Sequence, residues 1–175
     1  MYKYLGVLQD AVGKNREMKE KVGKEYLRRV KLLSKSKLYA GNLIRGINAW
    51  AVGVIRYSAG ILDWTSHEKK LDTKTRKILT MGGAFNRKSS TVRLYRKRNE
   101  GGKGLISIED CVRCEEANLS QYVQNSEEWL LKEVAEMDLV SSAETGEDYK
   151  KRIDLEKKEA LKSKPLHGKF LNIID

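Results

Sequence analysis

A single proline, Pro165, occurs in the 175 residues, and it lies close to the C-terminal end. Proline kinks or ends a helix because it lacks the backbone N–H and clashes with the preceding turn. A chain with so little proline can form long helices without interruption. With 40% hydrophobic residues, it also has enough apolar side chains for a core. We therefore expect a mainly α-helical fold, with one domain or one domain and an appendage. Residues 2–8 are short, apolar and aromatic, and they predict a short N-terminal β segment whose partner strands we expect outside this chain.

Residues 15–39 have a clear helical pattern. Their apolar side chains recur every three or four positions, as on one face of an amphipathic helix; these are Met18, Val22, Tyr26, Val30 and Leu33. Cations recur with the same spacing on the opposite side, at Lys21, Lys24, Arg28, Lys31 and Lys35. A solvated face usually mixes charges of both signs, because opposite charges pair at i,i+4. This row of cations therefore predicts contact with a polyanion, and an ordinary solvated face is the alternative.

The net charge is unevenly divided along the chain. Residues 1–110 contain 25 Lys and Arg against 10 Asp and Glu, whereas residues 111–175 contain 10 against 14. Such a basic front half favours a polyanionic partner, of which nucleic acid is the commonest. A membrane surface is the next candidate.

The segment 43–62 is the most apolar part of the chain, with Arg45 and Arg56 as its charges. It predicts a buried central helix, and the small residues 58–60 are a candidate break. Trp50 and Trp64 are expected in the core, because tryptophans at helical spacing in an apolar run are usually buried. A turn is predicted just before this segment, at Gly41-Asn42.

Capping signatures predict two further helices. Thr65-x-x-Glu68 should begin a basic helix that ends near residues 82–83. Ser107-x-x-Asp110 should begin another, whose inward side chains are Val112, Leu119, Tyr122 and Val123. A short helix should follow from residue 126. Residues 138–147 are expected to form a linker, and residues 148–164 a solvated helix with a thin apolar stripe.

A second basic segment, residues 86–98, holds six cations and no acid. Its interpretation stays open between a flexible basic loop and a segment that contacts phosphates. Arg93, Arg96 and Arg98 are therefore a second set of candidate nucleic-acid ligands. The glycine-rich residues 100–105 are expected to form a tight turn, because the Lys-Ser/Thr pair of a phosphate-binding loop is missing.

The residues give no sign of a catalytic or metal site. Cys111-x-x-Cys114 is at most half of a zinc site, and His67 and His167 do not stand at ligand spacing. Two-metal phosphoryl transfer needs converging carboxylates, and no Asp-Asp pair occurs. We therefore expect no catalytic residue, no metal and no cofactor in this chain.

Several segments share a pattern with one protein family. Residues 2–7 read Tyr-Lys-Tyr-Leu-Gly-Val, residues 47–64 contain both tryptophans of the apolar run, and residues 71–77 and 100–105 add shorter matches. Residues 166–171 read Leu-His-Gly-Lys-Phe-Leu. Together these segments, which extend over nearly the whole chain, resemble the reverse transcriptases of non-LTR (LINE-type) retrotransposons.

This resemblance implies a division of the chain. Residues 1–10 would be the end of the palm, with a primer-grip hairpin that includes Tyr4, Leu5 and Gly6. Residues 11–137 would form a helical, thumb-like domain, and residues 138–175 a linker and a loosely packed C-terminal helix. The basic face of residues 15–39 would follow the backbone of the template–primer duplex.

The same resemblance implies what the chain lacks. The fingers, most of the palm and the aspartates that hold Mg²⁺ would stand outside it, as would the Cys/His knuckle and nuclease regions further downstream. We therefore expect a fragment of an RNA-directed DNA polymerase, or a degenerate copy of one, that is inactive alone. Mg²⁺ is expected only for the full polymerase, and the palm and fingers of the same polyprotein are expected partners.

The expected function is to grip nucleic acid, an RNA–DNA hybrid or a duplex, without sequence specificity. One alternative is a helical protein–protein interaction module with no nucleic-acid role, and another is a piece cut from an active polymerase. No apolar run approaches the ~18–20 residues that span a bilayer. No secretory signal opens the chain. We therefore expect no membrane partner and a cytoplasmic or nuclear location.

Overall fold

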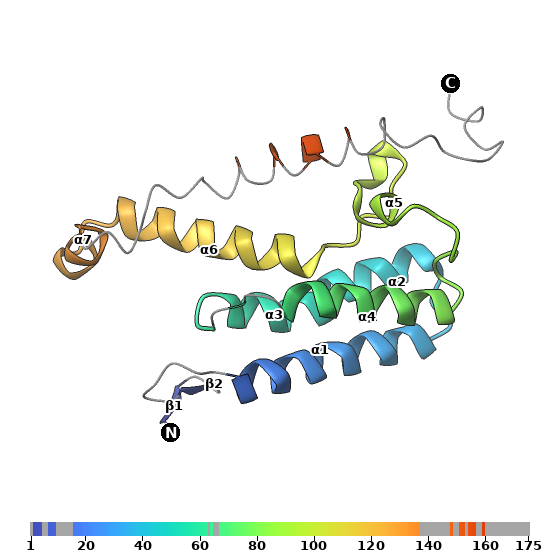
Figure 1. The fold of residues 1–175 in the computed structure, drawn as a ribbon, viewed down its shortest axis with the longest axis horizontal. Helices are drawn as coiled ribbons and strands as arrows, with labels where there is room; N and C mark the ends of the chain where they lie inside the picture. Colours follow the sequence, from blue (N-terminus) through green and yellow to red (C-terminus); the bar gives the residue numbers. More distant parts are fainter. Residues whose placement is uncertain are drawn as a thin grey trace.

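The structure is a computed structural model, and it describes residues 2–4, 7–9, 16–62, 64, 67–136, 148, 151–152, 154–156 and 159. Its body is built from helices in three layers (Figure 1). α1 (Arg16–Lys35) forms one outer layer, α3 (Val52–Ala59) and α4 (His67–Met81) form the middle layer, and α6 (Ile108–Asn125) covers them from the other side. The prediction of a mainly α-helical fold is confirmed.

α1 follows the predicted amphipathic pattern closely. Met18, Val22, Tyr26 and Val30 are buried, and Leu33 packs against the same core. The helix ends at Lys35, four residues before the expected end, and the backbone N–H of Ser36 bonds to the carbonyl groups of Leu32 and Leu33 in its last turn. Residues 37–39 then carry the chain to the next helix.

The predicted central helix is present but has a π-helical turn inside it. α2 (Ala40–Gly46), the π turn η1 (Ile47–Ala51) and α3 follow one another directly. In a π turn the backbone hydrogen bonds join residues i and i+5, so the turn contains one residue more than an α-helical turn. The extra residue rotates the following part of the helix about its axis. This rotation keeps Val52, Ile55 and Ala59 on the same buried side as Ile44 and Ile47. The predicted break near residues 58–60 is confirmed, since α3 ends at Ala59.

Two predictions for this segment are wrong. Gly41-Asn42 is not a turn but lies inside α2, whose first N–H groups, those of Asn42 and Leu43, bond to the carbonyl of Tyr39 at 2.9 Å. Trp50 is not in the core, because the π turn leaves it at the edge of the helix with 42% of its surface exposed. Trp64, the other tryptophan expected in the core, is buried as predicted.

α1 and α4 run parallel and lie close together. Leu71 packs against Gly23, and further along the Tyr26 hydroxyl meets Thr75 Oγ1 at 3.0 Å. Because the Thr75 hydroxyl donates to the Leu71 carbonyl, Tyr26 is the donor in this pair. Burial raises the pKa of the Tyr26 hydroxyl far above its usual value, so it stays protonated and donates. The start of α4 predicted at Thr65 lies outside the described residues, whereas the predicted end near residues 82–83 is confirmed.

After α4 the chain turns through α5 (Thr91–Tyr95) and the 3₁₀ turn η2 (Arg98–Glu100) into α6. Ser107 caps α6, since its hydroxyl accepts from the Asp110 N–H, as the sequence predicts. The first half of α6 is buried through Ile108 and Val112. The prediction that Leu119 and Tyr122 point inward is wrong, because they are 46% and 62% exposed.

The exposed half of α6 has a simple cause in the layout. α6 is longer than α3 and α4, on which it packs, and together with α7 (Trp129–Glu136) it extends past the end of the bundle (Figure 1). The apolar side chains of α6 therefore continue at helical spacing past the point where the core ends.

At the N-terminal end, β1 (Tyr2–Tyr4) and β2 (Val7–Gln9) pair antiparallel, with Lys3 opposite Leu8. The partner of β1 is therefore β2 of the same chain, whereas the sequence analysis placed the partner strands outside it. Further partner strands, in a palm-like sheet, stay a prediction. The predicted linker 138–147 lies outside the described residues, as does most of the predicted helix 148–164. Its described residue Asp154 forms an ion pair with Lys97, just before η2.

Candidate nucleic-acid interface

The predicted cations of α1 lie on one side of the helix. At 100° per residue, Lys21, Lys24, Arg28, Lys31 and Lys35 fall within about 80° of arc. All five are exposed, and their sector is opposite the buried side chains of Met18, Val22, Tyr26 and Val30. We call these five residues the α1 row. With a rise of 1.5 Å per residue, the row extends over about 21 Å.

The four lysines of the α1 row differ from its arginine. Among the residues that the structure describes, no carboxylate lies within ion-pair distance of Lys21, Lys24, Lys31 or Lys35. Arg28, by contrast, donates to both oxygens of Glu25, from Nε at 2.7 Å and from Nη2 at 2.9 Å. The lysine part of the row is therefore open to a ligand, whereas a ligand for Arg28 must compete with Glu25.

Glu25 also accepts a hydrogen bond from Nε of Arg29 at 2.8 Å. The hydrogen bonds from Arg28 and then Arg29 lower the pKa of Glu25 to about 2. Arg29 in turn holds the edge of the π turn, since its Nη1 donates to the Trp50 carbonyl at 2.9 Å and its guanidinium lies 5.0 Å from the centre of the Trp50 ring. This cation–π contact accounts for an exposed tryptophan at a helix edge.

The second set of predicted ligands, Arg93, Arg96 and Arg98, stabilises the loop that contains it. Nε of Arg93 donates to the Gly101 carbonyl at 3.3 Å, and Nε of Arg96 pairs with Glu100 at 3.0 Å. Arg98 donates to the carbonyl groups of Lys103 and, across to α2, Gly41. These guanidinium groups already have acceptors within the fold. Their role in nucleic-acid binding stays a prediction.

Asn48 was not among the predicted site residues, although it fixes this loop to the π turn. Its Nδ2 donates to the Gly104 carbonyl at 2.7 Å, and its Oδ1 accepts from the Ile106 N–H at 3.0 Å. The one available sequence signal was a polar amide inside the most apolar segment of the chain.

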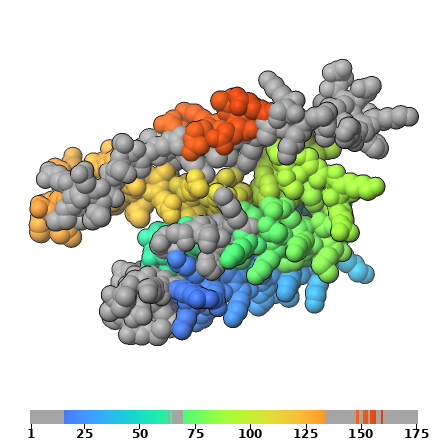
Figure 2. Space-filling view, viewed as in Figure 1, coloured from blue at the N-terminus to red at the C-terminus, as the bar shows by residue number. Residues whose placement is uncertain are grey.

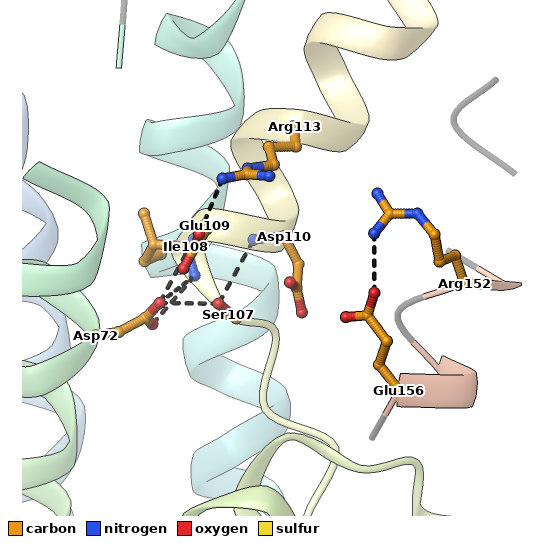
Figure 3. A network of polar contacts seen from close by, with 8 residues as sticks. All are labelled: Asp72, Ser107, Ile108, Glu109, Asp110, Arg113, Arg152 and Glu156. Atoms are coloured by element: carbon orange, nitrogen blue, oxygen red, sulfur yellow. Dashed lines mark hydrogen bonds and ion pairs between the residues drawn. The ribbon is translucent and has the colours of Figure 1, made fainter. Parts of the chain in front are cut away.

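Asp72 is the second residue whose role the sequence analysis missed. Its carboxylate lies at the start of α6, where it accepts from the Ser107 hydroxyl and from the backbone N–H groups of Ile108 and Glu109 (Figure 3). Burial raises the pKa of Asp72 above its usual range, and the hydrogen bonds from α6 oppose that rise. The sequence signal for this role was an acid directly after the apolar Leu71, in a helix with more cations than acids.

The two cysteines do not complete a metal site within the described part of the chain. Cys111 and Cys114 are both buried in α6, and no disulfide joins them. Burial raises the pKa of Cys111 to about 11, so its thiolate is scarce at neutral pH. No group of three or more His, Cys, Asp or Glu residues that could hold a metal ion occurs among the described residues.

The predicted primer-grip residues can be followed only in part. Tyr4 is the last residue of β1, and Leu5 and Gly6 lie outside the described residues. Within the described chain, no helix is both long enough and apolar enough to cross a membrane.

Comparisons of this chain with protein-family models, with curated proteins and with solved structures gave no match. The sequence resemblance to non-LTR reverse transcriptases therefore stays a prediction.

Proposed function

We propose that this chain binds the phosphate backbone of nucleic acid through the α1 row, without reading sequence. The observation that carries the proposal is the set of four exposed lysines, Lys21, Lys24, Lys31 and Lys35, which face away from the core and have no carboxylate partner among the described residues. Lysine binds phosphate as a point charge, so it fixes position without identifying bases. Affinity then comes largely from the release of counterions.

The length of the row suits such a ligand. A duplex strand has one phosphate per 3.4 Å of axis, so about six phosphates lie along the ~21 Å from Lys21 to Lys35. The four lysines follow one another at intervals of three to seven residues, which places them about 5–10 Å apart along the helix axis. Each can therefore meet a different phosphate.

Within this proposal, the chain has the role of a reverse-transcriptase thumb. The helical body would close on a template–primer duplex, the N-terminal β segment with Tyr4 would belong to a primer grip, and the palm and fingers would be supplied by the rest of the same polyprotein. Catalytic aspartates and their Mg²⁺ would belong to those parts. The compartment would be the cytoplasm or the nucleus.

The experiment is a salt titration of binding to a fluorescently labelled RNA–DNA hybrid. On the B-DNA figure, each phosphate contact adds about 0.9 to the slope of log affinity against log salt. The double variant Lys24→Gln/Lys31→Gln should lower that slope by up to ~1.8. A control variant, Lys103→Gln/Lys132→Gln, removes the same charge from exposed positions outside α1 and α4 and should leave the slope nearly unchanged. Equal slopes for the wild type and the α1 variant would contradict the proposal.

One observation favours the alternative of a protein–protein interaction module. The part of α6 and α7 that extends past the bundle exposes several large apolar side chains, namely Leu119, Tyr122, Trp129 and Leu130. A surface of that kind suits a protein partner. A molecular mass well above 20 kDa by light scattering, together with no binding to the hybrid at low salt, would favour this alternative.

A further inference from the structure

α4 carries a second set of exposed lysines. Lys70, Lys74 and Lys77 fall within about 60° of arc at 100° per residue, and all three are exposed. We call them the α4 row. Within the described residues no carboxylate pairs with any of the three. Arg76, another cation of this helix, behaves differently, because it turns toward α5 and donates to the Tyr95 hydroxyl at 3.0 Å.

The contacts between α1 and α4 determine where the two rows point. Leu71 and Thr75 mark the side of α4 that faces α1, and Gly23 and Tyr26 mark the side of α1 that faces α4. The α4 row lies about 110° around its helix from those contacts, and the α1 row lies about 150° around α1 in the opposite sense. Because the helices are parallel, both rows lie on the same side of the plane through the two helix axes, and the α1 row also points away from α4.

The surface between the rows has apolar side chains at its centre. Leu27 of α1 and Ile78 of α4 are partly buried against the core and lie on the sides of their helices between the rows. In the space-filling view, α1 in blue and α4 in green adjoin one another along the bundle (Figure 2). The acids on this side of α1, Glu17 and Glu20, come before Lys21, and Glu20 pairs with Arg16 at 3.4 Å.

Resting on the function proposed above, we infer that the α4 row is a second phosphate-binding site and that the two rows together hold the two strands of one duplex. The axes of packed helices are about 8–10 Å apart. Because the two rows point in diverging directions, their side chains lie further apart than the helix axes do. A single backbone that follows one row leaves the lysines of the other without phosphates. A duplex has two backbones separated by a groove of about 6 or 12 Å, so each row can follow one strand.

The experiment compares three variants that each lose two positive charges: Lys24→Gln/Lys31→Gln in the α1 row, Lys70→Gln/Lys74→Gln in the α4 row, and the control Lys103→Gln/Lys132→Gln. Each is titrated with salt on a labelled 16-base-pair duplex and on one of its strands alone. Glutamine matches lysine in helix propensity, so the helices should be retained, and circular dichroism checks this.

On the duplex, the α1 and α4 variants should each lower the salt slope by up to ~1.8, and the control should change it little. On the single strand, the salt slope of the wild type should be about half its slope on the duplex. The α1 and α4 variants should each lower the single-strand slope by less than they lower the duplex slope. A loss of slope on the duplex for the α1 variant but not for the α4 variant would overturn the inference and leave the proposed function intact. No loss for the α1 variant would instead reject the proposed function.

Discussion

The Asp72 carboxylate accepts a hydrogen bond of 2.8 Å from the Ser107 hydroxyl, which lies 35 positions further along the chain. Ser107 is the N-cap of α6, so the middle of α4 holds the first turn of α6 in place. The Asp72 carboxyl also lies at the positive end of the α6 dipole, which favours its ionised form and so opposes the rise in pKa that burial causes. One side chain thus joins two of the three layers of the bundle.

Replacing Asp72 by alanine should destabilise the fold by about 1–3 kcal/mol, because the N–H of Ile108 and the Ser107 hydroxyl would be left without their acceptor in a buried place. Asp72→Asn should cost less, since one carbonyl oxygen remains. Urea unfolding followed by circular dichroism measures both. Lys74→Ala, on the exposed side of the same helix, should stay within about 0.5 kcal/mol of the wild type. An alanine variant at position 72 as stable as that control would contradict this role.

Asn48 has a comparable role between the π turn and the loop before α6. Asn48→Ala removes the donor to the Gly104 carbonyl and the acceptor for the Ile106 N–H, and we expect a loss of about 1–3 kcal/mol. Asn48→Asp keeps the acceptor but places a carboxylate oxygen against the Gly104 carbonyl, so it should be at least as destabilising as alanine. Denaturant unfolding of the two variants tests this order, and a reversed order would show that the amide donor is unimportant.

Local sequence rules account for much of the helical framework. The 3.6-residue pattern of α1 and the Ser107 cap both act within a few residues, and the structure has both. The π turn is different, because it shifts the helix by one residue and moves Trp50 out of the core. A regular period cannot anticipate such a shift.

The residues that hold the layers together were harder to predict for a physical reason. The partners of Asp72 lie 35 to 37 positions away, and those of Asn48 lie 56 and 58 positions away. Spacing along the chain carries no information on such contacts. The exposed side of α1, by contrast, is fixed by its own buried stripe, so the α1 row could be located from the sequence. Its ligand could not be, because exposure alone does not identify what binds.

The stability of α1 should depend on pH through Glu25. The pKa of Glu25 falls from its usual 4.5 to about 2 in the folded chain, chiefly through hydrogen bonds from Arg28 and Arg29. A carboxyl whose folded pKa is lowered stabilises the fold above its unfolded pKa, and this stabilisation is lost as the pH falls from 4.5 toward 2. As the pH falls from 4.5 to about 2, the melting temperature of Glu25→Gln should therefore decrease less than that of the wild type. Melting curves at several pH values with matched ionic strength measure the difference, and parallel wild-type and variant profiles would refute the assignment.

Two glycines should respond in opposite ways to alanine. A Cβ at Gly102 would overlap the backbone carbonyl of Arg96, in the loop where the Gly104 N–H bonds to the same carbonyl at 2.8 Å. Relief requires the backbone to move, so Gly102→Ala should cost about 1–3 kcal/mol. Gly53 lies exposed in α3, and a Cβ there meets nothing within 4 Å among the described residues. Gly53→Ala should therefore stabilise the fold by about 0.5–1 kcal/mol, because glycine loses more backbone freedom in a helix than alanine does. Thermal and urea unfolding measure the change in stability of each variant. A Gly102→Ala variant more stable than the wild type would contradict the predicted overlap with the Arg96 carbonyl.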